Sequence, residues 1–439
     1  MSTTKLPLAK IISDNLQLIR DQVRTLDSET LARQSGFLKR KPRKIQIPDL
    51  LLGLISLASH ATLSLPFVVS QIALACGLTY TKQAFSKRLN SSIQSFLGLV
   101  AGKLLGDLVG EVRAQGLLKP FGRVLLHDST VENVPEHLKK FFPGSSNRRK
   151  KFASLKIQLV VDMLNSSLVD CSLSGYTRND QAAAPDILSV IRPGDLVLRD
   201  LGYFVLSVFQ SIDLAGAYFL SRFRHGVGVF TLEGKPINLS QELKARGSID
   251  QDVLLGAQRV RVRLVALPVP EAVVNQRRRQ LKAAKDTRCK PSAQRVFLMG
   301  WNIFITNVGR RVWSAKALYP VYRLRWRIEM IFKAWKSHLG LREFNTTNVG
   351  LLSLSVMIKL LLCIMVYRFC QSLEFLKIGD RHVSLLKVAK IIAQCACLVV
   401  LALLDLKLEQ FLEYQLKNHA FYEQRGDRQN YFELLESLG

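Results

Sequence analysis

Five short apolar segments between residues 121 and 223 constrain the fold of this chain more than any other feature. Each has the length and composition of a buried strand: 122–130, 155–164, 167–175, 195–204 and 217–223. Helical patterns at about 181–191 and in the residues up to 214 complete a β-β-β-α-β-α-β order. The order predicts an α/β domain whose first and fourth strands end at Asp128 and Asp200. Ligands collect beyond strand ends in such folds.

A second constraint is the segment YRLRWRIEMIFKAWK, residues 322–336. An α-helix turns about 100° per residue, so four polar residues share one stripe with Lys333 beside it: Tyr322, Arg325, Glu329 and Lys336. The apolar residues of the segment form a neighbouring stripe that we expect to pack into a core. Polar groups at such a border are costly to desolvate unless they pair or bind a ligand. An ordinary amphipathic helix with an Arg325–Glu329 ion pair is the alternative.

The chain is strongly basic. It has 62 Lys and Arg against 34 Asp and Glu, a formal net charge of +28. Excess charge of this size favours a polyanion such as nucleic acid as the partner. A ribosomal or membrane-surface protein would share the charge, but 48% hydrophobic residues indicate a packed globular protein.

The sequence predicts a cytoplasmic protein that does not cross a membrane. The N-terminus lacks an apolar signal region, and the seven cysteines show no CxxC zinc spacing, so we expect reduced thiols. Two apolar stretches, 350–375 and 383–405, contain charged or amide residues every few positions: Lys359, Arg368, Lys387, Lys390 and Gln394. Such residues make a spanning helix expensive, so we expect core helices.

The N-terminal region has a helical pattern and two basic features. Residues 1–35 predict an amphipathic helix, and the run LKRKPRK at 38–44 would neutralise phosphates on DNA. Residues 69–89 predict a helix, a turn at Gly77 and a second helix capped by Thr79. The second helix would present polar side chains to a DNA groove: Tyr80, Lys82, Gln83, Lys87 and Arg88. Helix pairs with a glycine turn are common, so a purely structural role stays open.

Residues 224–312 separate the fifth strand from the 322–336 segment. Residues 260–269 predict a strand, and residues 295–308 predict two strands on either side of Gly300. The strongly basic segment 276–295 lies between them.

The spacing of Tyr322, Arg325, Glu329 and Lys336 resembles the signature of bacterial insertion-sequence transposases of the DDE type, and more narrowly the insertion-sequence-four group. The segment Asp200-Leu201-Gly202-Tyr203 is similar to the second motif of the family. The resemblance implies a ribonuclease H-like catalytic domain, residues 116–223 and 313–375. A β-strand insertion domain at 224–312 would interrupt it. A helical DNA-binding region at 1–115 and a helical C-terminal region at 376–439 would flank it.

The resemblance also implies phosphoryl transfer on DNA by Asp128, Asp200 and Glu329. These three acids would hold two Mg²⁺ ions, for which Mn²⁺ can substitute, and Asp128 would bridge them. Carboxylate oxygens are ligands that Mg²⁺ prefers. Each aspartate has a structural alternative: Asp128 precedes Ser-Thr as in a turn, and Asp200 is placed to cap a helix.

Further residues match family positions that contact DNA. The resemblance implies phosphate contacts by Tyr322, Arg325 and Lys336, with Lys333 beside them, and Arg222 is within reach of a phosphate. A tryptophan that stacks on a flipped base is expected in the insertion, where Trp301 is the first candidate and Trp313 the second. A buried core tryptophan is the alternative for both. The cluster at 148–151 suits backbone contact or a solvated loop.

The implied function is cut-and-paste transposition through a hairpin at the transposon end, by a homodimer on paired ends. A ribonuclease H-fold endonuclease without strand transfer is one alternative. A DNA-binding regulator with an inactive catalytic domain is another, and a basic membrane-associated protein is a third.

Overall fold

A computed structural model describes most of the chain between residues 21 and 394. The described residues are 14, 17, 21–42, 46–60, 63–76, 81–106, 116–146, 151–164, 167–283, 292–343, 348–374, 377–378, 381–382 and 385–394. The chain divides into two compact units, and each is considered by itself. One unit is Leu105–Ala334, and the other combines Met1–Leu104 with Trp335–Gly439.

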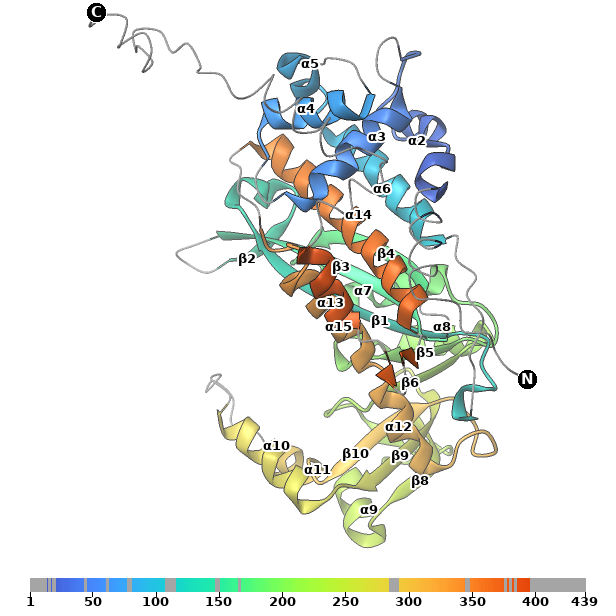
Figure 1. The fold of residues 1–439 in the computed structure, drawn as a ribbon. Coiled ribbons are helices and arrows are strands. Elements are labelled where there is room, and N and C mark those ends of the chain that lie inside the picture. Colours follow the sequence, from blue (N-terminus) through green and yellow to red (C-terminus); the bar gives the residue numbers. More distant parts are fainter. Residues whose placement is uncertain are drawn as a thin grey trace, which may run out of the picture. The chain divides into compact units, whose positions relative to one another are not determined.

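The unit Leu105–Ala334 is built on one mixed sheet of ten strands. The strands are β1 Val124–Val134, β2 Pro143–Ser146, β3 Lys151–Asp162, β4 Ser167–Gly175, β5 Leu196–Arg199, β6 Tyr218–Arg222, β7 Val229–Phe230, β8 Ile249–Leu255, β9 Val260–Pro268 and β10 Trp301–Thr306. Their order is β2-β3-β1-β5-β6-β10-β9-β8-β7, and β4 pairs with β3. Figure 1 follows this sheet from β2 through β1 and β5 to β9 and β8. A mixed α/β architecture is therefore confirmed.

The parallel part of the sheet lies where the strands are most apolar. β1 runs parallel to β5, and β5 runs parallel to β6. Every residue of β5 is buried, as expected for a parallel strand that is covered on both faces. The core around β5 includes Phe209 and Ile212 of the helix α8, Leu206–Leu214.

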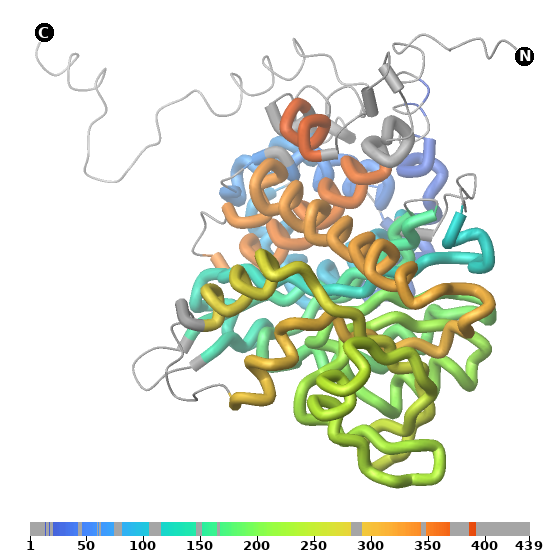
Figure 2. The backbone as a smooth tube through the Cα atoms, turned by 90° about the horizontal axis from the view of Figure 1, so that it is seen from below, coloured from blue at the N-terminus to red at the C-terminus, as the bar shows by residue number. Residues whose placement is uncertain are grey.

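The strands that follow residue 224 continue this same sheet. β10 is antiparallel both to β6 and to β9, and β8 is antiparallel to β9. Leu264 of β9 and Phe219 of β6 belong to one buried cluster. In Figure 2 the green segments, which include β6, β8 and β9, lie together.

The remaining helices of this unit are short. They are α7 Asp180–Ala183, α9 Leu239–Arg246, α10 Glu271–Ala283, α11 Ala293–Leu298 and α12 Leu318–Arg323, followed by the start of α13 Trp326–Ser337.

Several predicted elements are confirmed and several are wrong. The strand at 167–175 is confirmed as β4, and those at 217–223 and 260–269 are confirmed as β6 and β9. The strand β1 does not end at Asp128, because its ladder with β3 continues to Val134. The predicted strand that begins at 295 is wrong. These residues form α11, where the Ser292 side chain accepts a hydrogen bond from the amide of Arg295.

Two predicted helices are divided. The helix at 181–191 is α7 followed by a 3₁₀ helix, Ala184–Ser189, which contains Pro185. The segment 322–336 is not one helix, because α12 ends at Arg323 and α13 begins at Trp326. Successive amides here bond to carbonyls three residues back, from Leu324 to Val321 and from Arg325 to Tyr322. These bonds are of the 3₁₀ type, which is tighter than the α-helix.

The other unit is helical in the part that the structure describes, apart from a short hairpin. Its elements are α2 Ser28–Gln34, α3 Ile47–Ser56, α4 Leu65–Cys76, α5 Lys82–Ser86, α6 Ser91–Gly106, α14 Val349–Glu374, α15 Leu385–Gln394, and the hairpin β11 Lys377–Ile378 with β12 Arg381–His382. The N-cap of α5 is Thr81, whose side chain accepts a hydrogen bond from the amide of Ala84, so the predicted cap at Thr79 is wrong.

The helix α14 carries the first apolar stretch. It is long and apolar enough to cross a membrane, but 89% of its most apolar window is buried inside the structure, which is typical of a core helix. Its Lys359 donates hydrogen bonds to the carbonyl oxygens of Gly340 at 2.8 Å and Glu343 at 2.6 Å. These bonds satisfy the buried ammonium group.

Some predictions concern residues outside those described. They include most of the predicted helix at 1–35, the end of the basic run at 43–44, the turn at 77–80, the basic residues 148–150 and residues 284–291. The C-terminal residues 395–439 also fall there.

Candidate active site

The topology of the sheet brings Asp128 and Asp200 together. His127 of β1 pairs with Arg199 of β5 in the parallel ladder. Asp128 and Asp200 each follow one member of that pair, on neighbouring strands. Adjacent strands are about 4.8 Å apart, so the two aspartates are neighbours at the same edge.

The side chain of Arg325 joins Glu329 to this pair. Its Nη1 atom lies 2.9 Å from Oδ2 of Asp128, and its Nη2 atom lies 2.6 Å from Oε1 of Glu329. One guanidinium thus contacts both carboxylates, so the carboxylates of Asp128 and Glu329 lie close together. The hydroxyl of Tyr322 is 3.4 Å from Oδ1 of Asp200. The three acids, the tyrosine and the arginine predicted from sequence therefore meet at one place.

The residues that meet here lie on both sides of the break between α12 and α13. Tyr322 lies at the end of α12, Arg325 lies in the turn, and Glu329 lies in the first turn of α13. The turn directs Tyr322 and Arg325 to different aspartates, Asp200 and Asp128. A straight helix would align them in one row.

The structural alternatives for the two aspartates do not hold. Asp128 lies within the strand β1 rather than in a turn, and its Oδ1 atom accepts a hydrogen bond from the amide of Ser129 at 2.8 Å. Asp200 precedes a 3₁₀ turn, Leu201–Tyr203, but its side chain makes no capping bond.

The electrostatics of the site favour a cation. Burial raises the pKa of Asp128 to about 6, against the lowering effects of the Ser129 amide and Arg325, and the neighbouring Asp200 and Glu329 raise it further. Burial, followed by the charge of Asp200, raises the pKa of the Tyr322 phenol. Three acids that crowd together destabilise each other's negative charge, and a bound cation relieves this.

The donor set suits a hard divalent cation, but Arg325 occupies it. Carboxylate oxygens are the ligands that Mg²⁺ and Mn²⁺ take in proteins. Across the described ranges, no three His, Cys, Asp or Glu side chains are grouped as ready-made metal ligands. Asp128 and Glu329 instead direct oxygens to the guanidinium.

A buried network of Arg199, His127 and Tyr203 adjoins the two aspartates in the sequence. The sequence analysis did not predict most of it. The fully buried Arg199 places Nη2 2.9 Å from Nδ1 of His127. The ring of Tyr203 lies 4.3 Å from the His127 ring and 5.2 Å from the Arg199 guanidinium. Burial and Arg199 hold the pKa of His127 well below its usual value, so the neutral ring accepts the hydrogen bond. An arginine next to Asp200 in an apolar strand was the signal for this network.

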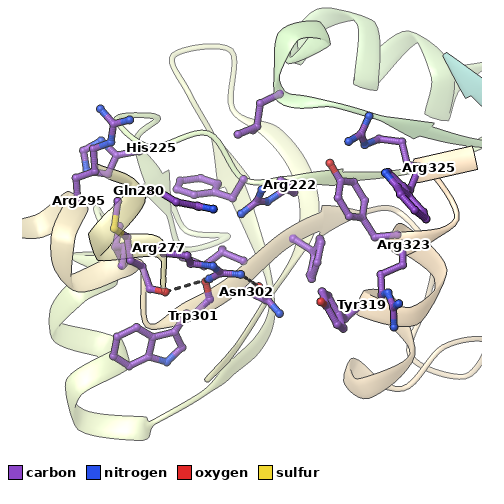
Figure 3. A pocket seen from close by; sticks show the side chains of 18 of the residues that line it. Arg222, His225, Arg277, Gln280, Arg295, Trp301, Asn302, Tyr319, Arg323 and Arg325 are labelled. Carbon is purple, nitrogen blue, oxygen red and sulfur yellow. Dashed lines mark hydrogen bonds between the residues drawn. The ribbon is translucent and has the colours of Figure 1, made fainter. Parts of the chain in front are cut away.

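A cleft of about 950 Å³ adjoins the acids, since Tyr322 and Arg325 line it. No Asp or Glu is among its lining residues. Its basic side chains are Arg222, His225, Arg277, Arg295, Arg323 and Arg325, and its aromatic ones are Phe223, Trp301, Phe304, Tyr319, Tyr322 and Trp326. Figure 3 shows Arg277 and Arg295 on one side, Tyr319, Arg323 and Arg325 on the other, and Arg222 between them. The cleft suits an anion with flat apolar groups.

The sequence-predicted DNA contacts fall in different places. Arg222 and Trp301 line the cleft. The indole of Trp301 donates to the Gly247 carbonyl oxygen at 3.1 Å, and its ring centroid lies 4.5 Å from that of Phe297. Trp313, by contrast, is fully buried and donates to the Leu117 carbonyl oxygen at 2.8 Å. It is a core residue.

The remaining predicted contacts are not among the residues that line the cleft. Lys333 is exposed on α13 and Lys336 lies in its last turn. Lys82 and Gln83 lie on α5, and Lys87 and Arg88 follow it, in the unit that contains Met1–Leu104. The sequence did not single out Arg277, Arg323 or Tyr319, although the basic run at 276–295 contains the first of these.

Comparison with known proteins found a family model, relatives in sequence and a structural neighbour. The family model described as "Transposase DDE domain" matches residues 119–366, a range that contains Asp128, Asp200 and Glu329. The transposase for insertion sequence element IS231C of Bacillus thuringiensis subsp. berliner is 29% identical over 366 residues, 76% of each chain. The transposase for IS1151 of Clostridium perfringens is 25% identical over 344 residues, 73% of this chain and 72% of the relative. A solved piggyBac transposase synaptic complex with hairpin DNA is similar at a TM-score of 0.46 and 9% identity, over 94% of this chain and 87% of that one.

Proposed function

Because the chain belongs to the family of DDE transposases, enzymes that transfer phosphoryl groups on DNA, we propose that it moves an insertion sequence by a cut-and-paste route. Asp128, Asp200 and Glu329 are the catalytic acids in this proposal. The observation that carries it is their convergence around Arg325 and Tyr322.

The three acids have the chemistry to hold two divalent ions, Mg²⁺ or Mn²⁺. When bound, such ions activate a nucleophile and stabilise the leaving oxygen in an in-line displacement. Asp128 neighbours Asp200 across the β1–β5 ladder and shares Arg325 with Glu329, so it is the acid that would be shared by the two ions.

The reaction we propose has a nick followed by a strand attack. Water forms a bond to a phosphorus at the transposon end and the 3′-oxygen leaves, so the end carries a 3′-hydroxyl. The oxygen of this hydroxyl then attacks a phosphorus of the opposite strand and displaces the 3′-oxygen of the flanking DNA, which gives a hairpin on the transposon end. Water opens the hairpin at the same phosphorus and restores the 3′-hydroxyl. The hydroxyl finally attacks a phosphorus of target DNA and displaces a 3′-oxygen of the target strand. Arg222 and Arg325, which line the cleft, would hold the non-bridging oxygens, since a guanidinium can grip a phosphate bidentately.

Other residues extend the DNA contact. Trp301 at the cleft is the candidate platform for a flipped base. Lys333 and Lys336 follow Glu329 along α13 as phosphate contacts. Lys82, Gln83, Lys87 and Arg88 at α5 are the proposed contacts of the N-terminal region with the transposon end.

The architecture in this proposal is the one that the resemblance implies. It comprises a ribonuclease H-like catalytic domain, residues 116–223 and 313–375, with a β-rich insertion at 224–312 between helical terminal regions. A homodimer on paired ends, in a bacterial cytoplasm beside the nucleoid, would carry out the reaction.

The proposal is tested by cleavage of a DNA duplex that carries the element's own ends, with Mg²⁺ present. We expect Asp128→Asn, Asp200→Asn and Glu329→Gln each to lower cleavage by about 10³-fold or more while DNA binding persists, because a lost metal ligand removes charge stabilisation of the transition state. Glu242→Gln, on the surface helix α9, is the matched control and should cleave like the wild type.

The same substrates separate the alternatives. A pre-cut end with a free 3′-hydroxyl should be joined to target DNA, whereas an endonuclease without strand transfer gives no joined product. Full cleavage by the Glu329→Gln variant would refute the catalytic assignment, and DNA binding with no cleavage by the wild type would favour a regulator.

A further inference from the structure

Arg325 faces two environments at once. Its guanidinium bonds Asp128 and Glu329, and the same residue lines the basic cleft beside them. Its side chain is 16% exposed, and its Nε atom is buried with no hydrogen-bond partner in the part of the chain that the structure describes. The guanidinium therefore holds two carboxylates while one of its own donors stays unsatisfied.

On the acid side, Arg325 competes with a metal ion. The guanidinium takes one oxygen of Asp128 and one of Glu329 at 2.9 and 2.6 Å. A divalent ion between these carboxylates needs the same lone pairs and the same negative charge. Both partners are positive, so they cannot occupy this place together.

On the cleft side, Arg325 faces uncompensated positive charge. Four other arginines, Arg222, Arg277, Arg295 and Arg323, line the cleft without any acid among the lining residues. Burial and the nearby Arg222 lower the pKa of Arg277, which shows how closely these cations are crowded. A phosphate that enters the cleft relieves this repulsion and offers Arg325 a second anionic partner.

We propose that Arg325 makes metal loading depend on DNA binding. Its guanidinium keeps Asp128 and Glu329 from a divalent ion until a DNA phosphate in the cleft draws it away, and the released carboxylates then bind the ion. This inference rests on the proposed function, since it assumes that the three acids are the metal site. The metal site would then be assembled only when a DNA strand is already bound, which would prevent metal-dependent cleavage elsewhere.

The test measures Mn²⁺ binding to the full-length protein, from the loss of the free-ion EPR signal, without DNA. Charge-assisted hydrogen bonds that hold a side chain are strong enough that their removal should tighten Mn²⁺ binding about tenfold in Arg325→Gln. Arg325→Lys keeps the charge but cannot span both carboxylates, and it should bind with intermediate affinity. If Arg325→Gln fails to fold by circular dichroism, Arg325→Lys decides the question.

The matched control is Arg323→Gln, which removes an exposed cation of the same cleft that makes no bridge between the acids. It should bind Mn²⁺ like the wild type. Adding a duplex of the transposon end, with binding to DNA alone subtracted, should raise the affinity of the wild type to that of Arg325→Gln.

Two results would overturn the inference in different ways. Equal Mn²⁺ affinity of the wild type and Arg325→Gln without DNA, or an equal gain in Arg323→Gln, refutes the competition and leaves the proposed function intact. Absence of Mn²⁺ binding in every variant, with and without DNA, refutes the metal site itself, and the inference fails with it.

Discussion

The contrast between Trp313 and Trp326 gives a sharp prediction about the stability of the unit Leu105–Ala334. Trp313 is fully buried, its ring centroid lies 5.1 Å from that of Phe121, and its indole donates to the Leu117 carbonyl oxygen. Truncating a buried aromatic residue to alanine costs about 3–5 kcal/mol, and leaving the Leu117 carbonyl oxygen unpaired adds about 1 kcal/mol. Trp313→Ala should therefore lower the free energy of unfolding by about 4–6 kcal/mol.

The assay is urea unfolding followed by circular dichroism, which does not depend on the fluorescence of the substituted tryptophans. Trp313→Phe keeps a ring in place and should cost about 2 kcal/mol, from one lost hydrogen bond and a small cavity. Trp326→Ala is the matched control. This side chain is 62% exposed, so the change should stay within about 0.5 kcal/mol. An unchanged unfolding midpoint in Trp313→Ala would show that this residue is not a core anchor and would reopen its assignment as a base platform.

The other predictions concern the charges of the same unit. Because burial raises the pKa of Asp128 to about 6, a metal must displace a proton below that pH, and the cleavage rate should rise between pH 5 and pH 7 and level off above. A rate that is flat over this range would contradict the assignment. Arg263→Met should cost about 3 kcal/mol in urea unfolding, because the buried guanidinium bonds Asp250 and the carbonyl oxygens of Val308 and Trp313. Arg261→Met breaks an exposed pair with Asp252 and should cost under about 1 kcal/mol.

The strands that were predicted are local apolar runs, whereas β2, β7 and β8 were not predicted. β4 and β9 were found nearly to the residue, since both alternate or continue in apolar residues between turn signals. The helix α11, Ala293–Leu298, shows where this reasoning fails, because a strand was predicted there. An apolar run as short as VFLMG fits a strand or a helix, and the cap at Ser292 decided for the helix.

The candidate site was predictable in its residues but not in its geometry. Fixed spacing identified Tyr322, Arg325 and Glu329, yet the turn between α12 and α13 has no Gly or Pro to announce it. The geometry of the site depends on where Asp128 and Asp200 lie in the sheet. These positions are set by pairing between strands that are distant in sequence. The burial of Arg199 behind them is likewise a property of the assembled core.

The order of the strands also fixes the distance between β10, which carries Trp301, and β1, which carries Asp128. β10 is separated from β1 by β6 and β5 alone, so Trp301 and Asp128 belong to strands about 14 Å apart across the hydrogen-bonding direction. Backbone ladders set this spacing, and a change of side chain does not alter it. If a flipped nucleotide stacks on Trp301, the number of nucleotides between it and the cleaved phosphodiester bond of the same DNA strand would therefore be constant.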